Sequence, residues 1–375
     1  MNNGIHLTLM IGPAVPVPVS KEIIEALTSI EVTTSTSGAS VFQLQFTLSN
    51  RSPLHILFLL SGGSSIPIIR VVIIVTIGGL TEILMDGVMT NHEVSPGNQP
   101  GQSILTVTGE DLTKLMDYID FSGLPFPAMP PELRVLVILA KYAAFGIIPL
   151  VIPAILPDIP IPVIHIPRQK GNDLSYVRQL ADEIGYVFYI EPGPAPLTNT
   201  AYWGPEVKVG QPQPALSINM DAHTNVESLS FNYDSEKAAL PILLIQNPQT
   251  RAPIPIPIPD ITPLSPPLGA IPPIPKNFPF IDGISQHSPV RAALIGLAKA
   301  AKSNEVVSGS GELDVLRYGR VLKARKLVGV RGAGTAFDGL YYVDSVTNKI
   351  KRGEYKQSFQ LKRNGLISTL SEVPT

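Results

Sequence analysis

Apolar and polar side chains alternate in several short stretches, which is the pattern of strands with one buried face. In residues 41–48 the apolar residues Phe42, Leu44, Phe46 and Leu48 are separated by polar ones. Weaker alternation recurs at residues 30–34, 87–94 and 103–108. We therefore expect a first β domain over residues 1–120, built as a tube-like barrel and ending in a helix at residues 110–117.

The C-terminal part of the chain predicts a β-hairpin. A glycine-rich loop at residues 331–335 and the turn pair Asp338-Gly339 precede an apolar run at residues 340–346. A basic turn then leads into residues 354–362, where apolar and polar residues alternate again. Two antiparallel strands are not stable alone in water, so this hairpin must complete a larger sheet. We expect it to close a second tube-like barrel over residues 201–366, to which residues 216–220 and 229–233 add strands.

Between the two β domains, residues 121–200 predict helices with proline-rich joints. Pro130-Pro131 is a favourable helix entry for an apolar face that ends before Gly146. A second helix starts at Asn172 or Asp173, either of which can cap it, and ends at Gly185. The predicted fold class is thus α+β and mainly β, with two tube-like β-barrel domains joined by a helical, proline-rich middle region.

A proline-rich insertion interrupts the second β domain at residues 241–279. Ile and Pro alternate at residues 254–259, a pattern that forms neither a helix nor a central strand, so we expect an extended excursion packed against another surface. A further helix is expected at residues 289–301, and residues 367–375 form a short tail. The two β domains hint at an internal duplication, although their sequences are too different to assert it.

Composition favours a subunit of an assembly. Of the 375 residues only 15% are charged and 44% are hydrophobic, and the mean hydropathy is +0.23. The net charge of −2 gives no drive toward nucleic acid, and the absence of cysteine excludes disulfides and thiolate chemistry. The N-terminal residues lack a basic region, so we expect no secretory signal peptide and assembly in the cytoplasm.

Two apolar runs raise the question of membrane insertion. Residues 133–166 contain five prolines and one aspartate, and Pro167 follows directly, which argues against a spanning helix. Residues 66–80 are interrupted by Arg70, and their apolar core is short and β-branched. We expect a buried strand there and no direct membrane insertion.

Catalytic motifs are not evident in the sequence. The six histidines are scattered, no serine lies in a Gly-x-Ser-x-Gly motif, and residues 332–337 depart from a dinucleotide-binding loop. The neighbouring acids Asp182 and Glu183 lie on different faces of a helix. We therefore expect no catalytic residue, no metal site and no cofactor.

Basic residues concentrate near the C-terminus and suggest an interface. A solvated face is the default interpretation of such a run, and a basic rim that meets an acidic partner is the sharper one. Nucleic acid comes third, because no known module of aromatic and basic residues accompanies the run. The lone tryptophan, Trp203, is either an interface anchor or an ordinary core residue. The candidate interface residues are Arg331, Lys349, Lys351, Arg352, Lys356 and Trp203.

The same C-terminal residues carry a resemblance to a known family. Residues 338–343, 349–359 and 363–366, and more faintly residues 172–233, resemble the hub proteins of contractile injection systems, the phage late control protein D family. The resemblance implies a homotrimer whose six tube-like domains form a pseudo-sixfold ring within a phage-tail-like particle. Its implied partners are an inner tube protein, a separate spike protein and other baseplate components. The alternative is a cell-wall-acting or ligand-binding β protein of such a particle.

Overall fold

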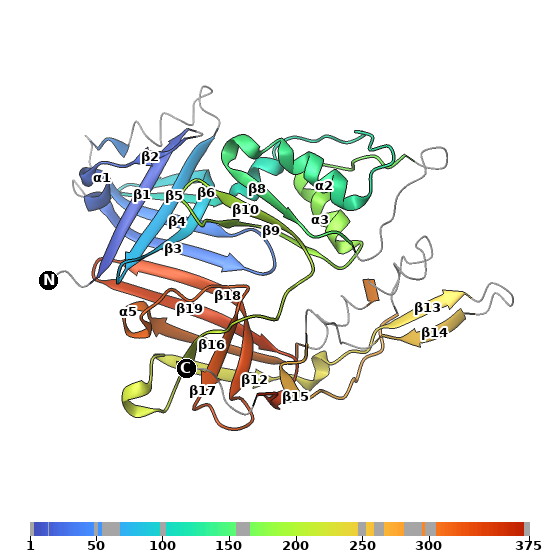
Figure 1. The fold of residues 1–375 in the computed structure, drawn as a ribbon. Coiled ribbons are helices and arrows are strands. Elements are labelled where there is room, and N and C mark those ends of the chain that lie inside the picture. Colours follow the sequence, from blue (N-terminus) through green and yellow to red (C-terminus); the bar gives the residue numbers. More distant parts are fainter. Residues whose placement is uncertain are drawn as a thin grey trace.

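The computed structural model describes residues 4–13, 15–48, 52–54, 68–97, 103–154, 166–246, 253–258, 266–280, 295–296 and 305–370. Strands dominate the structure and form two β units, one from each end of the chain (Figure 1). A smaller unit of helices and strands, the middle unit, lies beside the first β unit (Figure 1).

The first β unit follows the strand pattern of the sequence. Its strands are β1 (Ile5–Pro13), β3 (Leu27–Ser35), β4 (Val41–Leu48), β5 (Ile69–Ile77), β6 (Leu80–Ser95) and β7 (Ser103–Asp111). They are hydrogen-bonded in the order β3-β4-β7-β6-β5-β1, with the short β2 (Val17–Pro18) outside β1 and α1 (Lys21–Ala26) before β3. Every residue of β5 from Ile69 to Val75 is buried, which confirms the predicted buried strand. The helix expected at residues 110–117 is a short 3-10 helix, η2 (Leu112–Met116), capped by the Asp111 carboxylate.

The second β unit contains the predicted C-terminal hairpin. Its strands are β11 (Gln213–Ser217), β12 (Ser228–Tyr233), β16 (Val307–Asp314), β17 (Leu327–Arg331), β18 (Gly339–Lys351) and β19 (Glu354–Arg363), with α5 (Val315–Tyr318) after β16. They are hydrogen-bonded in the order β12-β16-β19-β18-β17-β11. The strand predicted at residues 354–362 is β19, and it lies between β16 and β18.

The two β units share one topology. Each unit has six main strands, which can be matched in chain order: β1 with β11, β3 with β12, β4 with β16, β5 with β17, β6 with β18, and β7 with β19. The matched strands then have the same order in the sheet. A register shift also occurs at the same place, between Met89 and Asn91 of β6 and between Val343 and Ser345 of β18. One difference is that β1 runs antiparallel to β5 whereas β11 runs parallel to β17. The topology thus supports the internal duplication that the sequence only hinted at.

The two units are joined by direct strand pairing. The second half of β18 pairs antiparallel with β3, from Ser345 opposite Ser35 to Lys351 opposite Ser29. This pairing, here called the seam, joins the units into one 13-stranded sheet with a common hydrophobic core. Ile30 and Val32 from one unit and Val346 from the other are all buried in that core.

The expectation of two closed barrels is therefore not supported. Within the described residues the strands form open units of one continuous sheet, and none of them closes on itself. The physical reason is the length of β18. The first half of its 13 residues pairs with β17, and the second half pairs with β3. The predicted mainly β fold is confirmed, but the two separate barrel domains are not.

The middle unit is built on a small sheet as well as on helices. Helices α2 (Pro131–Ala140) and α3 (Asp173–Asp182) pack with β8 (Ile147–Val151), β9 (Val187–Pro192) and β10 (Asn199–Gly204) around a separate core. Both helices lie where the sequence predicts them, and the Asn172 side chain caps α3 by accepting from the Ser175 backbone N–H at 2.8 Å. Besides the helices expected in this proline-jointed region, the structure shows a three-stranded sheet in the order β8-β10-β9.

The proline-rich insertion forms an arm that extends from the second β unit (Figure 1). Strand β13 (Ile242–Gln246) pairs antiparallel with β14 (Pro253–Pro257), in which only Ile254 and Ile256 have N–H groups to donate. Proline is tolerated in edge strands, and both strands of this isolated pair are edge strands. The insertion is extended here, as predicted. Nearer the body, β15 (Gly269–Ile271) pairs with β20 (Leu366–Ser368). Of the helix expected at residues 289–301, only Ile295 and Gly296 are within the described residues, and both are helical.

The apolar segments of the chain do not form long helices in the part that the structure describes. Among the described residues, no helix is long and apolar enough to cross a membrane. The apolar run at residues 133–166 is divided between α2, β8 and residues 155–165, which lie outside the described residues.

Candidate functional site

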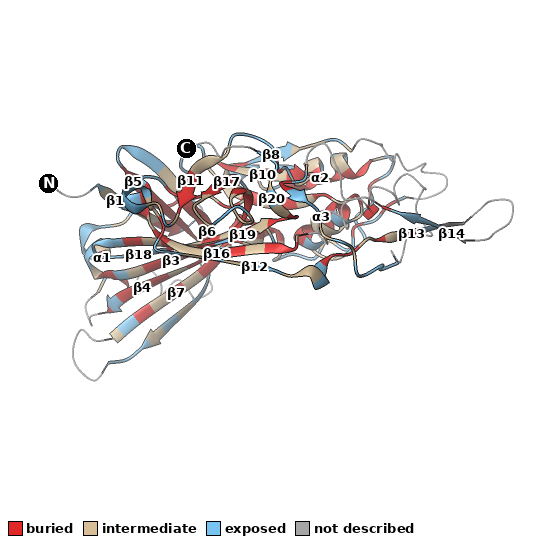
Figure 2. Ribbon diagram, turned by 90° about the horizontal axis from the view of Figure 1, so that it is seen from below, coloured by how far each residue is buried: buried red, intermediate tan, exposed pale blue. Residues whose placement is uncertain are grey.

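The shared sheet has one apolar and one polar face. Along β18 the side chains of Val346, Asn348 and Ile350 are buried, while Lys349 and Lys351 between them are exposed. Buried and less buried residues alternate in the same way along the neighbouring strands β3, β4, β16 and β7 (Figure 2). This alternation places the core on one side of the sheet and solvent on the other.

We call the solvent side of the eight strands from β12 to β6 the outer polar face. Strand registers align its residues in rows that cross both β units. One row runs from Ser358 through Thr347 to Thr33, and the next from Lys356 through Lys349 to Glu31. Between its charged residues the face carries many uncharged polar side chains, including Ser230, Ser310, Gln360, Ser345, Gln43, Gln45, Thr106, Thr108 and Asn91.

Polar side chains fasten the seam on both sides of the sheet. On the outer polar face the hydroxyls of Thr33 and Thr347 lie 2.9 Å apart. On the core side Asn348 is 4% exposed, and its amide donates to the Val32 carbonyl at 3.3 Å. The Asn348 Oδ1 atom accepts from both Tyr355 Oη and Gln357 Nε2, each at 2.8 Å. A buried polar network with its members paired in this way fixes a single register between the units.

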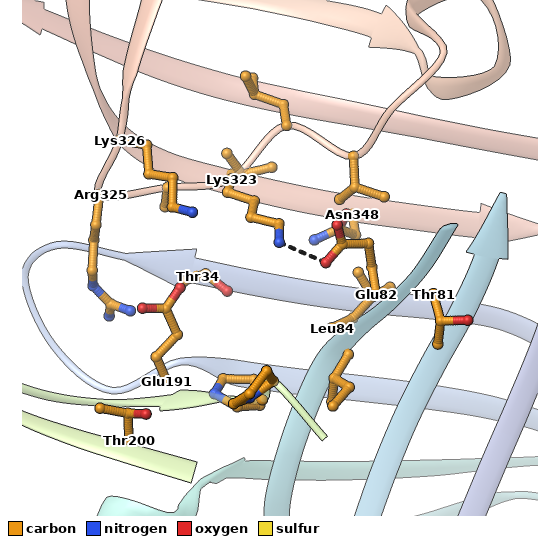
Figure 3. Close-up of a pocket in the computed structure, with 18 residues that line it drawn as sticks. Thr34, Thr81, Glu82, Leu84, Glu191, Thr200, Lys323, Arg325, Lys326 and Asn348 are labelled. Carbon is orange, nitrogen blue, oxygen red and sulfur yellow. Dashed lines mark ion pairs between the residues drawn. The ribbon is translucent and has the colours of Figure 1, made fainter. Parts of the chain in front are cut away.

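A cavity of about 450 Å³ lies where the two β units meet the middle unit. Glu82 of β6 and Lys323 of the loop before β17 form an ion pair across it at 2.6 Å (Figure 3). Glu191 of β9 and Arg325 also face this space (Figure 3). The Arg325 guanidinium lies 4.1 Å from the centre of the Tyr189 ring, and it donates to the Ser35 carbonyl at 2.5 Å. The charged groups of the cavity thus connect the three units to one another.

A buried ion pair connects the first β unit to the middle unit. Arg70 and Asp86 lie in neighbouring strands and form two hydrogen bonds of 2.6 Å, both in the interior. The Asp86 carboxylate also accepts from the Asn199 amide of β10 at 2.8 Å. In the sequence, Arg70 is recognisable only as an interruption of an apolar run. An arginine inside a β-branched strand was the signal for a buried carboxylate partner.

The predicted basic interface residues are divided between places. Lys349, Lys351 and Lys356 lie on the outer polar face, and Arg352 lies in the turn that follows β18. Arg331 ends β17, which pairs with the opposite end of β18. The set therefore does not form one continuous rim.

Several C-terminal basic residues are engaged within the chain. Lys356 pairs with Glu227 at 2.8 Å, and this hydrogen bond raises the pKa of the lysine. Lys362 pairs with Asp344 at 2.9 Å and with Glu305 at 3.1 Å. Arg363 is 1% exposed and donates to the carbonyls of Ala336, Asp338 and Gly365. It lies over the Tyr341 ring and so fixes the loop after β17, a structural role that the charge pattern alone did not reveal.

Trp203 belongs to the core of the middle unit. Its side chain is fully buried, its indole N–H donates to the Val177 carbonyl at 3.3 Å, and its ring meets Tyr186 edge-on. Of the two interpretations left open for this residue, the structure favours the core residue over the interface anchor.

The described residues contain no group of three or more His, Asp or Glu side chains that could hold a metal ion. His6 and His223 are exposed, His92 is half-buried, and the other three histidines lie outside the described residues.

Comparisons with known proteins relate the whole fold to tail proteins. No protein-family model and no curated protein matches the chain. Solved structures do match over nearly its full length. A tail protein from Neisseria meningitidis superposes with a TM-score of 0.64 at 12% identity, covering 97% of this chain and 98% of that one. A 43 kDa tail protein from a Shewanella oneidensis prophage gives 0.59 at 13% identity, covering 96% and 98%.

The likeness extends to a secretion machine. A component of the E. coli type VI secretion system, itself described as structurally similar to bacteriophage T4 tail proteins, superposes with a TM-score of 0.56 at 13% identity. It covers 93% of this chain and 77% of that one. The resemblance found in the sequence is thus confirmed at the level of the fold: this chain has the fold of phage tail proteins and of a type VI secretion component.

Proposed function

We propose that the chain is the structural hub of a contractile injection system baseplate. In this role three copies form a ring that joins a hexameric inner tube to a trimeric spike. The observation that carries the proposal is the pair of β units with identical strand order in one chain. Three copies of such a chain contribute six similar units, so a threefold ring can match a sixfold neighbour.

The parts that are not duplicated suit the other side of the ring. The middle unit and the proline-rich arm each occur once per chain. Three copies therefore present them with threefold symmetry, as a trimeric partner requires. This division supports a symmetry adaptor better than it supports a ring with two equivalent faces.

The outer polar face suits the bore of such a ring. Its serine, threonine, asparagine and glutamine side chains are uncharged and hydrated, and its charged residues include both lysines and acids. A channel lined in this way offers passing macromolecules no apolar patch and no strong field. We place this face toward the central channel of the trimer.

The proposed partners follow from this place in the particle. They are a second and third copy of the chain, an inner tube protein, a separate spike protein and other baseplate components. Nucleic acid and direct membrane insertion have no part in the proposal. The chain assembles in the cytoplasm and resides in a phage-tail-like particle, in keeping with the tail proteins whose fold it shares.

We also propose that the chain is not an enzyme. In the central cavity Lys323 pairs with Glu82, and Arg325 donates to the Ser35 carbonyl. Charged groups engaged in this way hold the units together, which favours a structural role over general acid and base catalysis.

Native mass spectrometry and a hydrolysis assay test the proposal together. The purified chain is expected to have the mass of three 40.3-kDa subunits, to bind separately purified tube and spike proteins, and to leave peptidoglycan intact. A monomer that degrades peptidoglycan would instead establish the cell-wall-acting alternative.

A further inference from the structure

We infer that two strand edges that no described strand covers, the end of β6 and the outer edge of β12, pair with each other between neighbouring copies. The inference rests on the proposed ring and names the contact that closes it. It comes from the internal duplication, because one of the two equivalent junctions is already formed inside each chain.

The junction inside the chain is the seam. Strand β18 pairs with β19 on one side, and on the other side with β17 and then with β3. Its equivalent, β6, pairs with β7 on one side, and on the other side with β5 only as far as Val88. From Thr90 to Ser95 no described strand occupies the position that β3 takes beside β18.

The missing strand has a counterpart at the far end of the sheet. Strand β12 is the equivalent of β3 in the second β unit, and within the described residues it pairs only with β16. Among the described strands of each chain, the position beside the end of β6 is therefore unfilled and one edge of β12 is free. A head-to-tail contact between these two closes a ring when it is repeated.

The shared register shift predicts which residues meet. Aligning the shift in β6 with that in β18 makes Glu93 the equivalent of Thr347. The strand registers across β19 and β16 in the second unit, and across β7 and β4 in the first, carry this alignment to the next strand. Asn232 of β12 is then the equivalent of Thr33 of β3. Because Thr33 is opposite Thr347, we expect Glu93 of one copy opposite Asn232 of the next in an antiparallel pair.

The side chains at these positions are complementary on both faces. On the outer polar face the Asn232 amide can donate to the Glu93 carboxylate, where the seam has its hydroxyl pair. On the core side the same register brings Val94 opposite Phe231. Both are half-buried and pack against the common core, so pairing would cover the parts they still expose.

The paired stretches of β6 and β12 contain neither lysine nor proline. Natural edge strands are protected by lysine, proline or an outward bulge. The sequence of β12 is Ser-Leu-Ser-Phe-Asn-Tyr, and β6 ends in Thr-Asn-His-Glu-Val-Ser, with one charged residue between them. Edges of this composition are suited to pairing rather than to solvent.

Disulfide trapping tests the contact directly, since the chain has no cysteine of its own. The variant carrying Glu93→Cys and Asn232→Cys, both at exposed positions, is oxidised and separated without reductant. We expect linked species that extend to three chains and no further. A mixture of the two single variants should stop at linked pairs of chains.

Two matched variants calibrate the trapping. Thr33→Cys with Thr347→Cys should form an intrachain disulfide at the equivalent position of the seam, with no increase in mass. Glu93→Cys with Ser310→Cys should not link, because Ser310 lies one strand further from the contact, about 5 Å beyond β12.

The outcomes separate this contact from the proposed function. If the unmodified chain is a trimer and Glu93→Cys with Asn232→Cys does not link while the seam pair does, the edge contact is wrong and the ring stands. Linked species that stop at two chains in the double variant also overturn it. A monomer with no interchain linkage overturns both.

Discussion

The side-chain amide of Asn348 donates a hydrogen bond to the backbone carbonyl of Val32, across 316 positions of sequence. This bond joins a strand of the C-terminal β unit to a strand of the N-terminal one. Tyr355 and Gln357 hold the Asn348 oxygen, and Gln357 in turn bonds the backbone of Leu322 in both directions. The seam is thus a specified contact with its own polar network, rather than a generic meeting of apolar surfaces.

Removing this network should weaken the whole fold. Asn348→Leu leaves the Val32 carbonyl without its side-chain donor and takes the shared acceptor from Tyr355 and Gln357, so we expect a loss of about 1–3 kcal/mol. The measurement is the free energy of unfolding in urea. Lys349→Ala, at the exposed neighbouring position, should stay within about 0.5 kcal/mol of the parent. Equal stability of the two variants would show that the seam does not depend on Asn348.

The buried ion pair between Arg70 and Asp86 should be costly to break. Arg70→Met leaves the Asp86 carboxylate buried with a single amide donor from Asn199, and we expect a loss of about 3–5 kcal/mol. Thermal unfolding followed by calorimetry checks it. The control is Lys21→Ala, which removes an exposed ion pair with Glu25 and should change stability by less than about 1 kcal/mol. Similar losses in both variants would contradict the role assigned to burial.

Alkaline pH should destabilise the chain. Burial raises the pKa of Tyr341, Tyr342 and Tyr355 above the ordinary value of about 10. The folded protein then keeps protons that the unfolded chain releases, so the stabilisation is complete below pH 10 and is lost as the pH rises further. Each such tyrosine contributes up to about 1.4 kcal/mol per pH unit in that range.

The alkaline effect is measured in two ways. Urea unfolding at pH 8 and pH 11 should show a lower midpoint at pH 11, and tyrosinate absorbance of the folded protein should report fewer ionised tyrosines than the unfolded chain. Ionisation of every tyrosine near pH 10 with the fold intact is the opposite result.

Close packing between strands leaves little room for a side chain at Gly109. A Cβ on Gly109 of β7 would lie 2.3 Å from the Val88 carbonyl oxygen and 2.4 Å from the Phe42 ring. Because backbone and a buried ring are involved, Gly109→Ala should cost about 1–3 kcal/mol. Urea unfolding measures it, with Thr108→Ala on the outer polar face as the neutral control. A stable Gly109→Ala protein would mean that β6 and β7 separate more readily than the structure indicates.

Sequence patterns predicted the strands better than their partners. The alternation at residues 41–48 and 354–362 identified β4 and β19, and the capping residue Asn172 identified the start of α3. Periodicity shows which side of a strand is buried, but it does not show which strand lies beside it. For this reason β18 was expected inside a closed barrel, whereas it pairs with strands of both β units.

The candidate site was predicted less completely than the fold. Charge runs identified the exposed Lys349 and Lys351, but they did not distinguish these from Lys362 and Arg363, whose partners come from distant parts of the chain. The outer polar face had no motif, because each strand contributes only a few unremarkable polar residues. Strand order alone brings those residues into one surface.

The most direct test of the central claim, that each chain supplies two like β units to a ring of six, is electron microscopy of the purified chain bound to its tube protein. Averaged views along the axis are predicted to show six similar lobes around one channel, with additional density repeated three times on the opposite face. A ring with any other number of lobes, or a single copy without a channel, would contradict the account.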